Sequence, residues 1–265
     1  LEKIPLFAIT VLSAVITYIS QARTSGASLP TEHSPWRIPL ILCHNIIFYP
    51  MKMLWPSNLS SHYAFPQPLD LTSPMVLAGV IGTLMLLALL LFSLRYTRIP
   101  VIGWLIWFLT ILPTMQIIGF SNVIASDKYT YFPVFGLLMV LAWYLGRLWD
   151  HATGPGRRPV VRGLIVAVTL GLACAYISTA RTYLTCWSDT VTLYRYMLGF
   201  TPNAWPLHDT LAYALAEQGN IRQAREHWKL VENLNPYPYV AHYNQGIAHL
   251  QQKQLSEAKK EFETA

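Results

Sequence analysis

The sequence predicts an all-α protein in two parts: a polytopic transmembrane helix bundle of about five spans, then a tetratricopeptide-repeat α-solenoid. Of the 265 residues, 53% are hydrophobic and only 12% are charged, about half the charged share of an ordinary soluble domain. Charge-free apolar runs recur before residue 182, and Pro202 and Pro236 stand 34 residues apart, the tetratricopeptide period. We therefore expect a transmembrane domain over 1–182 and repeats over 183–265.

Charge is unevenly divided between these parts. Residues 1–182 contain 12 Lys and Arg against 5 Asp and Glu, whereas residues 183–265 contain 7 against 8, so the apolar part provides the formal net charge of +6. Basic residues beside long apolar runs mark membrane topology more often than affinity for nucleic acid. The composition therefore excludes a disordered chain and predicts a lipid bilayer, with no nucleic acid, as the partner of the first part.

Five windows without a charged residue approach the roughly 20 residues that cross a hydrocarbon core of about 30 Å. These windows are residues 4–21, 75–94, 99–119, 129–146 and 163–180. Pro113 within the third removes a backbone hydrogen bond and is expected to kink that helix. Five such windows in 180 residues exceed what a soluble core supplies, so we interpret them as spans.

The basic residues near the span ends predict the orientation, because Lys and Arg favour the cytoplasmic side. With a cytoplasmic N-terminus, seven of them face the cytoplasm and five face the other side over longer loops. Five crossings then bring everything after residue 180 outside the cytoplasm. The protein is thus expected to be an integral membrane protein with its repeats in a periplasm or an ER lumen.

The segment 22–74 is too long for a turn and has an apolar stretch of its own, from Trp36 to Trp55, bracketed by Arg37 and Lys52. Tryptophan is enriched where a bilayer meets water. We expect one or two helices lying along the membrane interface, with packing of a loop onto the bundle as the alternative.

The C-terminal part predicts stacked helix pairs. Small and aromatic residues recur in phase, first as Ala224 and Trp228 and then as Ala258 and Phe262, although Lys253 stands where a turn glycine is usual. The expected units are a degenerate helix over 187–200, a repeat over 205–238 and a partial repeat over 239–265. Such arrays bind proteins or peptides in their groove. Because fewer than about three repeats are marginal, we expect this chain to be a fragment of a longer one.

Few residues of the sequence indicate chemistry. No nucleotide loop, catalytic triad, metal-ligand spacing or paired carboxylates are recognisable, so neither a metal nor a cofactor is predicted. Asp127, Lys128, Tyr129 and Tyr131 stand together at the outer mouth of a predicted span. They are expected either to receive an anionic headgroup or to form a local Asp127–Lys128 pair with tyrosines as interface anchors.

Residues 125–133, Ala-Ser-Asp-Lys-Tyr-Thr-Tyr-Phe-Pro, resemble the Ala-Asp-Arg-Tyr-x-Tyr-Leu-Pro signature of the transmembrane and tetratricopeptide-repeat O-mannosyltransferases and their bacterial relatives. Residues 49–56, Tyr-Pro-Met-Lys-Met-Leu-Trp-Pro, followed by Leu59, are similar to the Tyr-x-x-Lys-x-Leu-Trp-Pro-x-x-Leu motif of that family. Gly-Trp-Leu-Ile-Trp-Phe at 103–108 is a further match, and the resemblance covers nearly the whole chain in order.

The resemblance implies a GT-C type glycosyltransferase, a membrane enzyme that moves a sugar, here mannose-like, from a polyprenyl-phosphate carrier to protein acceptors outside the cytoplasm. It implies that the essential acidic residue lies in an earlier loop, so the catalytic residues are expected upstream of residue 1. Lys52, Lys128 and, more weakly, Arg37 are the candidates for binding the lipid phosphate, with Asp127, Tyr129 and Tyr131 in support. The alternative is a non-enzymatic, membrane-anchored repeat scaffold for protein assembly.

Overall fold

In the computed structural model all the regular elements among the described residues are helices, and one isolated antiparallel bridge joins Tyr63 to Ala125. The described residues are 4, 5, 9, 11–13, 15, 16, 19, 20, 35–66, 68–117, 123–153, 159–235, 239–251 and 253–265. The all-α prediction is confirmed over these residues. The chain divides into two compact units, Leu1–Gly171 and Leu172–Ala265.

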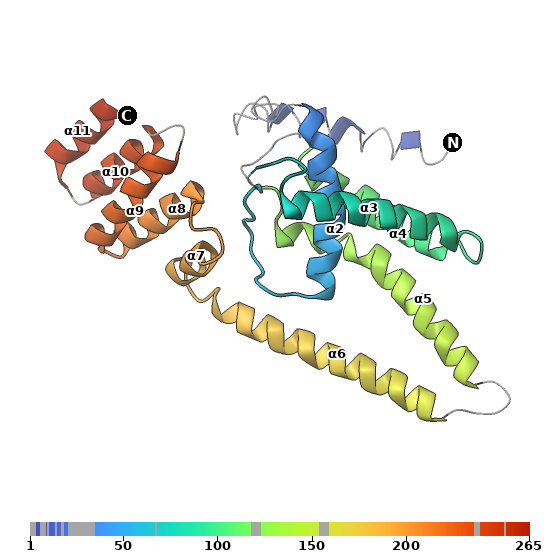
Figure 1. Cartoon of the computed structure of the whole chain (residues 1–265). Coiled ribbons are helices and arrows are strands. Elements are labelled where there is room, and N and C mark those ends of the chain that lie inside the picture. The colour runs from blue at the N-terminus through green and yellow to red at the C-terminus, as the bar shows by residue number, and fades with distance from the viewer. Residues whose placement is uncertain are drawn as a thin grey trace. The chain divides into compact units, whose positions relative to one another are not determined.

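The first unit is made of apolar helices, of which α3 and α4 are joined by a short turn, whereas a long irregular loop connects α2 to α3 (Figure 1). Its elements are η1 (Pro35–Arg37), α2 (Ile38–Leu54), α3 (Pro74–Ser93), α4 (Ile99–Ile111), η2 (Leu112–Thr114), η3 (Asp127–Thr130), α5 (Val134–Thr153) and the start of α6 (Pro159–Thr185). The helices α2, α3 and α4 each have proline in the first turn, where its missing N–H costs nothing. The predicted interfacial stretch forms a single helix, α2.

Two of the described helices, not five, are long and apolar enough to cross a membrane. They are α3, with a mean hydropathy of 2.7, and residues Val160–Thr185 of α6, with 2.1. Both leave most of their apolar side chains exposed, which suits contact with lipid better than a place in a soluble core. Membrane association is thus supported by these two helices, while eight of the 18 residues of the first predicted span, 4–21, lie outside the described residues.

The third and fourth predicted spans are wrong as full crossings. The helix α4 ends at Ile111 and continues only as the 3-10 turn η2, which contains Pro113, so the apolar helix stops well short of residue 119. The fourth window begins in η3, and α5 starts only at Val134. Because Arg147 and Asp150 occupy the last turns of α5, its charge-free part is too short to span a bilayer.

Glycines let the helices of this unit approach backbone to backbone. A Cβ on Gly79 of α3 would lie 2.7 Å from the Cα of His44 in α2. A Cβ on Gly103 of α4 would lie 2.5 Å from the carbonyl oxygen of Gly136 in α5, and one on Gly136 would lie 2.7 Å from the nitrogen of Trp107. Both crossings therefore depend on residues without side chains, as is common between membrane helices.

A compact core forms where α2, α3 and α4 meet the segment before η3. Tyr49, Trp107, Ile111 and Met115 are fully buried there, together with Ile124. Figure 1 shows α2 running across the direction of α3 rather than alongside it. The close contacts of α2 with α3 fall in the first half of α3, where Thr83 donates a hydrogen bond to the carbonyl of Cys43 at 3.2 Å.

The second unit contains two helical hairpins preceded by a short helix. Its elements are α7 (Thr190–Leu198), α8 (Trp205–Glu217), α9 (Ile221–Leu234), α10 (Tyr239–Gln251) and α11 (Leu255–Thr264). The predicted helix 187–200 is shorter than expected, because the Asp189 side chain accepts a hydrogen bond from the Thr192 N–H at 2.9 Å and caps α7. Trp187 therefore precedes α7 and stacks edge-on against Tyr183.

The turns within the two hairpins repeat each other at the predicted spacing. Gly219, with φ of +81°, and Lys253, with φ of +62°, both adopt the left-handed conformation that ends a helix. The following N–H groups donate back to Leu215 and His249 at 2.8 and 2.9 Å. Glycine adopts this conformation without strain, so Lys253 keeps the geometry of the turn at some cost in backbone strain. Whether the unit belongs to the tetratricopeptide family stays a prediction.

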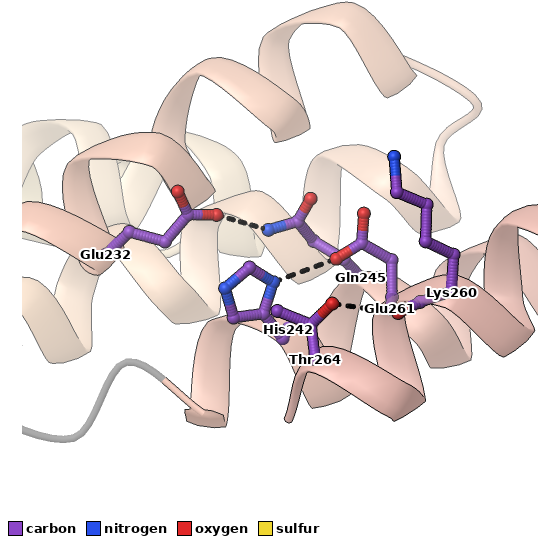
Figure 2. A network of polar contacts seen from close by, with 6 residues as sticks. All are labelled: Glu232, His242, Gln245, Lys260, Glu261 and Thr264. Atoms are coloured by element: carbon purple, nitrogen blue, oxygen red, sulfur yellow. Dashed lines mark hydrogen bonds and ion pairs between the residues drawn. The ribbon is translucent and has the colours of Figure 1, made fainter.

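Polar contacts join the hairpins to each other and α10 to α11 (Figure 2). Gln245 of α10 donates to the carboxylate of Glu232 in α9 at 2.8 Å, and His242 pairs with Glu261 of α11 at 2.9 Å. In α8, both oxygens of Asp209 lie 2.9 Å from the amide nitrogen of Asn244 in α10. Trp228 is almost fully buried between the helices, at the aromatic position expected of it.

Candidate functional site

The carboxylate of Asp127 joins two segments that are far apart in sequence. The Tyr63 hydroxyl donates to its Oδ1 at 3.0 Å, and the Ser60 N–H donates to its Oδ2 at 2.5 Å. Backbone bonds run beside them, from the Asp127 N–H to the Ser60 carbonyl and from the Tyr63 N–H to the Ala125 carbonyl, both at 3.2 Å. The segment after α2 is thereby held against the segment before η3.

Lys52, in the last turn of α2, lies over the ring of Tyr63. Its Nζ donates to the carbonyls of Ser57 and Asn58 at 2.6 and 3.3 Å and sits 5.1 Å from the ring centre of Tyr63. A second aromatic ring, Phe48, lies 5.7 Å away. Such cation–π contacts help to hold an ammonium in place. We call Lys52, Tyr63 and Asp127 the Lys52 cluster.

Burial changes the ionisation of the acids and bases here. Desolvation raises the pKa of Asp127 to about 6, against the hydrogen bonds from Tyr63 and Ser60 and the charge of Lys52, which lower it. Burial also lowers the pKa of Lys52, and Asp127 partly opposes this effect. Burial lowers the pKa of His62 to about 4, so this neighbour is neutral at pH 7. The cluster accordingly gains positive charge as the pH falls through about 6.

Buried polar side chains of α2 fix the segment that carries Asp127. The Asn45 amide donates to the carbonyl of Ile124 at 3.0 Å, and the hydroxyl of Tyr49 accepts from the N–H of Ser126 at 3.2 Å. Asn45, Tyr49 and Ser126 are fully buried. Because unpaired polar groups are costly in such a core, these bonds determine the register between α2 and residues 123–127.

The other predicted site residues lie outside the Lys52 cluster. Lys128 is exposed and rests 5.4 Å from the ring centre of Tyr129, while Tyr131 is 77% exposed. Among the described residues no ion pair joins Asp127 to Lys128, so the expected local pair is not formed. Tyr131 and its neighbour Phe132, 70% exposed, present an aromatic surface instead.

Arg37 is exposed in η1, and its charge acts on Asp70. Hydrogen bonds from the side chain and the N–H of Thr72 lower the pKa of Asp70, and the charge of Arg37 contributes to the same direction. Asp70 thus forms the turn that leads into α3. Arg37 is therefore associated with this turn rather than with Lys52.

Sequence reasoning missed Ser60 and Tyr63, which bring Lys52 and Asp127 together. Both belong to an irregular segment whose pairing partner is more than 60 residues away. Asn45, a polar residue within an apolar helix, gave a partial indication that a distant polar partner packs against α2. Buried amides of this kind need a partner, but the sequence does not identify the carbonyl of Ile124 as that partner.

No group of three or more His, Cys, Asp or Glu side chains that could hold a metal ion occurs among the described residues. No family model, curated protein or solved structure matches the chain. The relationship to the O-mannosyltransferases therefore stays a prediction from the motifs quoted above.

Proposed function

We propose that the chain is part of a membrane glycosyltransferase that transfers a mannose-like sugar from a polyprenyl-phosphate carrier to protein acceptors outside the cytoplasm. The Lys52 cluster is the observation that carries this proposal. It combines a partly desolvated cation with a carboxylate whose pKa of about 6 lies near a working pH. A cation of this kind stabilises the phosphate that leaves the sugar, and a carboxylate near its pKa exchanges protons readily.

The place of the cluster relative to the apolar helices supports a substrate at the membrane surface. Lys52 lies in the last turn of α2, which crosses the first half of α3. Two highly exposed tryptophans flank this helix, Trp36 at 86% and Trp55 at 74%. Tryptophans of this kind suit the level of the lipid headgroups. In our proposal α2 lies along the outer interface, and Lys52 faces the phosphate of a lipid whose chains are in the bilayer.

An apolar groove of about 320 Å³ between α2, α3 and α4 suits the carrier's hydrocarbon chain. Leu86, Leu90, Trp104 and Phe108 line it, and Ile46 connects it to the helix that carries Lys52. A prenyl chain is branched and apolar, so it gains by covering such a surface. In this proposal the helical hairpins of the second unit bind the acceptor or a partner protein outside the cytoplasm, in a periplasm or an ER lumen.

Binding of the glycosyl donor should weaken as the pH rises through about 6, because ionised Asp127 then repels the donor phosphate. Two unit charges about 10 Å apart repel by roughly 1.7 kcal/mol at an effective dielectric of about 20, so we expect a change of about tenfold. The measurement uses the full-length protein in nanodiscs and radiolabelled polyprenyl-phosphate mannose. This donor is a phosphodiester, so its own charge does not change between pH 5 and 8.

The variant Asp127→Asn should bind the donor with the same affinity at pH 5 and pH 7.5. Asn retains an oxygen that accepts from Tyr63 or Ser60, so the local bonds persist in part. Asp70→Asn, which removes an exposed carboxylate at the start of α3, is the matched control and should keep the pH dependence of the wild type. Equal pH dependence in wild type and Asp127→Asn would contradict the role given to Asp127.

The non-enzymatic scaffold is the second candidate. It is favoured by the fact that Lys52 already donates to two backbone carbonyls, so the cluster also serves to hold the loop after α2. A scaffold has no need of the lipid donor. The absence of saturable donor binding at every pH would therefore favour the scaffold over the enzyme.

A further inference from the structure

Two histidines of the second unit meet ring to ring at the packing surface between α8 and α9. The Nδ1 atoms of His208 and His227 are 2.9 Å apart, and His208 is only 6% exposed. The ring centres are 5.1 Å apart and the ring planes differ by 27°. Because the centres are farther apart than the nitrogens by about one ring diameter, the rings meet edge to edge, as a direct hydrogen bond requires.

The neighbours of His208 determine which nitrogen carries a proton. Its Nε2 lies 2.8 Å from the carbonyl oxygen of Pro202, which can only accept, so this nitrogen is protonated. In neutral His208 the Nδ1 is then an acceptor, and the Nδ1 of His227 donates to it. If His208 takes up a proton, its Nδ1 becomes the donor, and neutral His227 can accept by moving its own proton to Nε2.

A second proton has no place in this arrangement. With both rings protonated, both Nδ1 atoms carry hydrogen and the two N–H groups point at each other across 2.9 Å. A metal ion does not fit between them either, because the lone pairs are directed at one another along the line that joins the rings. The pair accommodates one added proton and excludes two.

The surrounding charges act mainly against a second proton. Burial lowers the pKa of His227, His208 and Arg195 lower it further, and Glu226 opposes them. Arg195 reaches over from α7 and is bonded to Gln223 of α9 at 2.9 Å. On the other side of α8, α10 presents Asn244, which is bonded to Asp209 and is itself uncharged.

We propose that His208 and His227 form an acid-sensitive lock that holds α8, α9 and the turn at Pro202 together, and that opens when the pair takes up its second proton. The lock requires only these two rings and the Pro202 carbonyl. It is independent of donor binding at the Lys52 cluster, so either proposal can fail without the other.

The sign of the pH effect follows from counting protons. In the open form His227 binds a proton below its ordinary pKa of about 6.5, whereas in the closed pair burial and the charges of His208 and Arg195 lower its pKa and exclude that proton. The closed form is therefore fully favoured above pH 6.5 and loses stability as the pH falls below it. One extra proton in the open form changes the ratio of closed to open form by up to about tenfold per pH unit.

Hydrogen–deuterium exchange of the full-length protein in nanodiscs tests the lock. After correction for the intrinsic pH dependence of exchange, protection of the α8 and α9 amides should fall by up to about tenfold between pH 6.5 and pH 5.5. His227→Gln removes the ring whose pKa is lowered in the closed pair, so this fall should disappear. His249→Gln is the matched control, because His249 lies in the same unit and is as buried as His208, but it is bonded to Gln254.

Constant protection of the wild-type helices between pH 6.5 and 5.5 would overturn the proposal, whatever the variants do. So would a fall in His227→Gln equal to that in the wild type. If His227→Gln is unprotected at pH 7.5, His227→Asn replaces it, since this side chain also offers an amide that does not titrate. Protection that rises on adding Zn²⁺ at pH 7.5 would mean that the pair binds a metal and would equally overturn the lock.

Discussion

Replacing Lys52 with alanine should weaken binding of polyprenyl-phosphate mannose by about tenfold to one hundredfold. A hydrogen bond to a charged partner contributes about 1.5 to 3 kcal/mol, and 1.4 kcal/mol is a factor of ten in affinity. The effect is expected to be large because Lys52 is held in place by Tyr63 and Phe48 and loses little freedom on binding. Donor titration of the full-length protein in nanodiscs measures it.

Two variants separate the charge of Lys52 from its structural role. Lys52→Arg retains the cation and the bonds to the loop carbonyls and should recover most of the affinity. Lys128→Ala removes an exposed cation from the same region and should change affinity by less than about threefold, because exposed charges interact weakly. Lys52→Ala with wild-type affinity would remove Lys52 from the site, and a loss confined to Lys128→Ala would transfer the role to that residue.

Substituting Gly136 with alanine should destabilise the first unit by about 1 to 3 kcal/mol, the usual cost of overpacking. The new Cβ would lie 2.5 Å from the carbonyl oxygen of Gly103 and 2.7 Å from the nitrogen of Trp107. These are backbone atoms of α4, so no side-chain rotation relieves the clash and the helices must move apart. Thermal unfolding of the full-length protein in detergent measures the loss.

Gly146→Ala is the matched control for this prediction. Gly146 lies in the same helix, α5, but a Cβ added there meets no atom within 4 Å. Alanine is also the better helix former, so this variant should be as stable as the wild type or slightly more stable. Equal midpoints for Gly136→Ala and Gly146→Ala would contradict the close crossing of α4 and α5.

The sequence was sufficient for the helical class and for elements whose cause is local. The charge-free window 75–94 predicted α3, the 34-residue period predicted α8, and the spacing of turns anticipated Gly219 and Lys253. The prediction of five spans is wrong where a charge-free stretch of sequence is longer than the helix that it contains. Pro113 ends the apolar helix α4 early, and Pro133 precedes a helix that starts later than the charge-free window.

The candidate site was predictable only in its parts. Lys52 and Asp127 were identified by residue type and by their position near apolar runs, but their association depends on Ser60 and Tyr63 in an irregular loop. Pairing between such distant segments follows from tertiary packing, here from Asn45 and Tyr49, and not from local propensity. The sequence consequently named Lys52 and Lys128 alike as candidates, and it gave no sign that Lys52 and Asp127 share Tyr63 as a neighbour in the fold.

Sugar transfer by the purified full-length protein in liposomes tests the central claim most directly. Polyprenyl-phosphate mannose labelled in the sugar is the donor, and an extract of secreted proteins supplies the acceptors. We expect the wild-type protein to transfer label to the acceptor proteins. At a limiting concentration of donor, the Lys52→Ala variant should transfer label at least tenfold more slowly than the wild type. If the wild-type protein binds the donor but transfers no label to the acceptor proteins, the claim is contradicted.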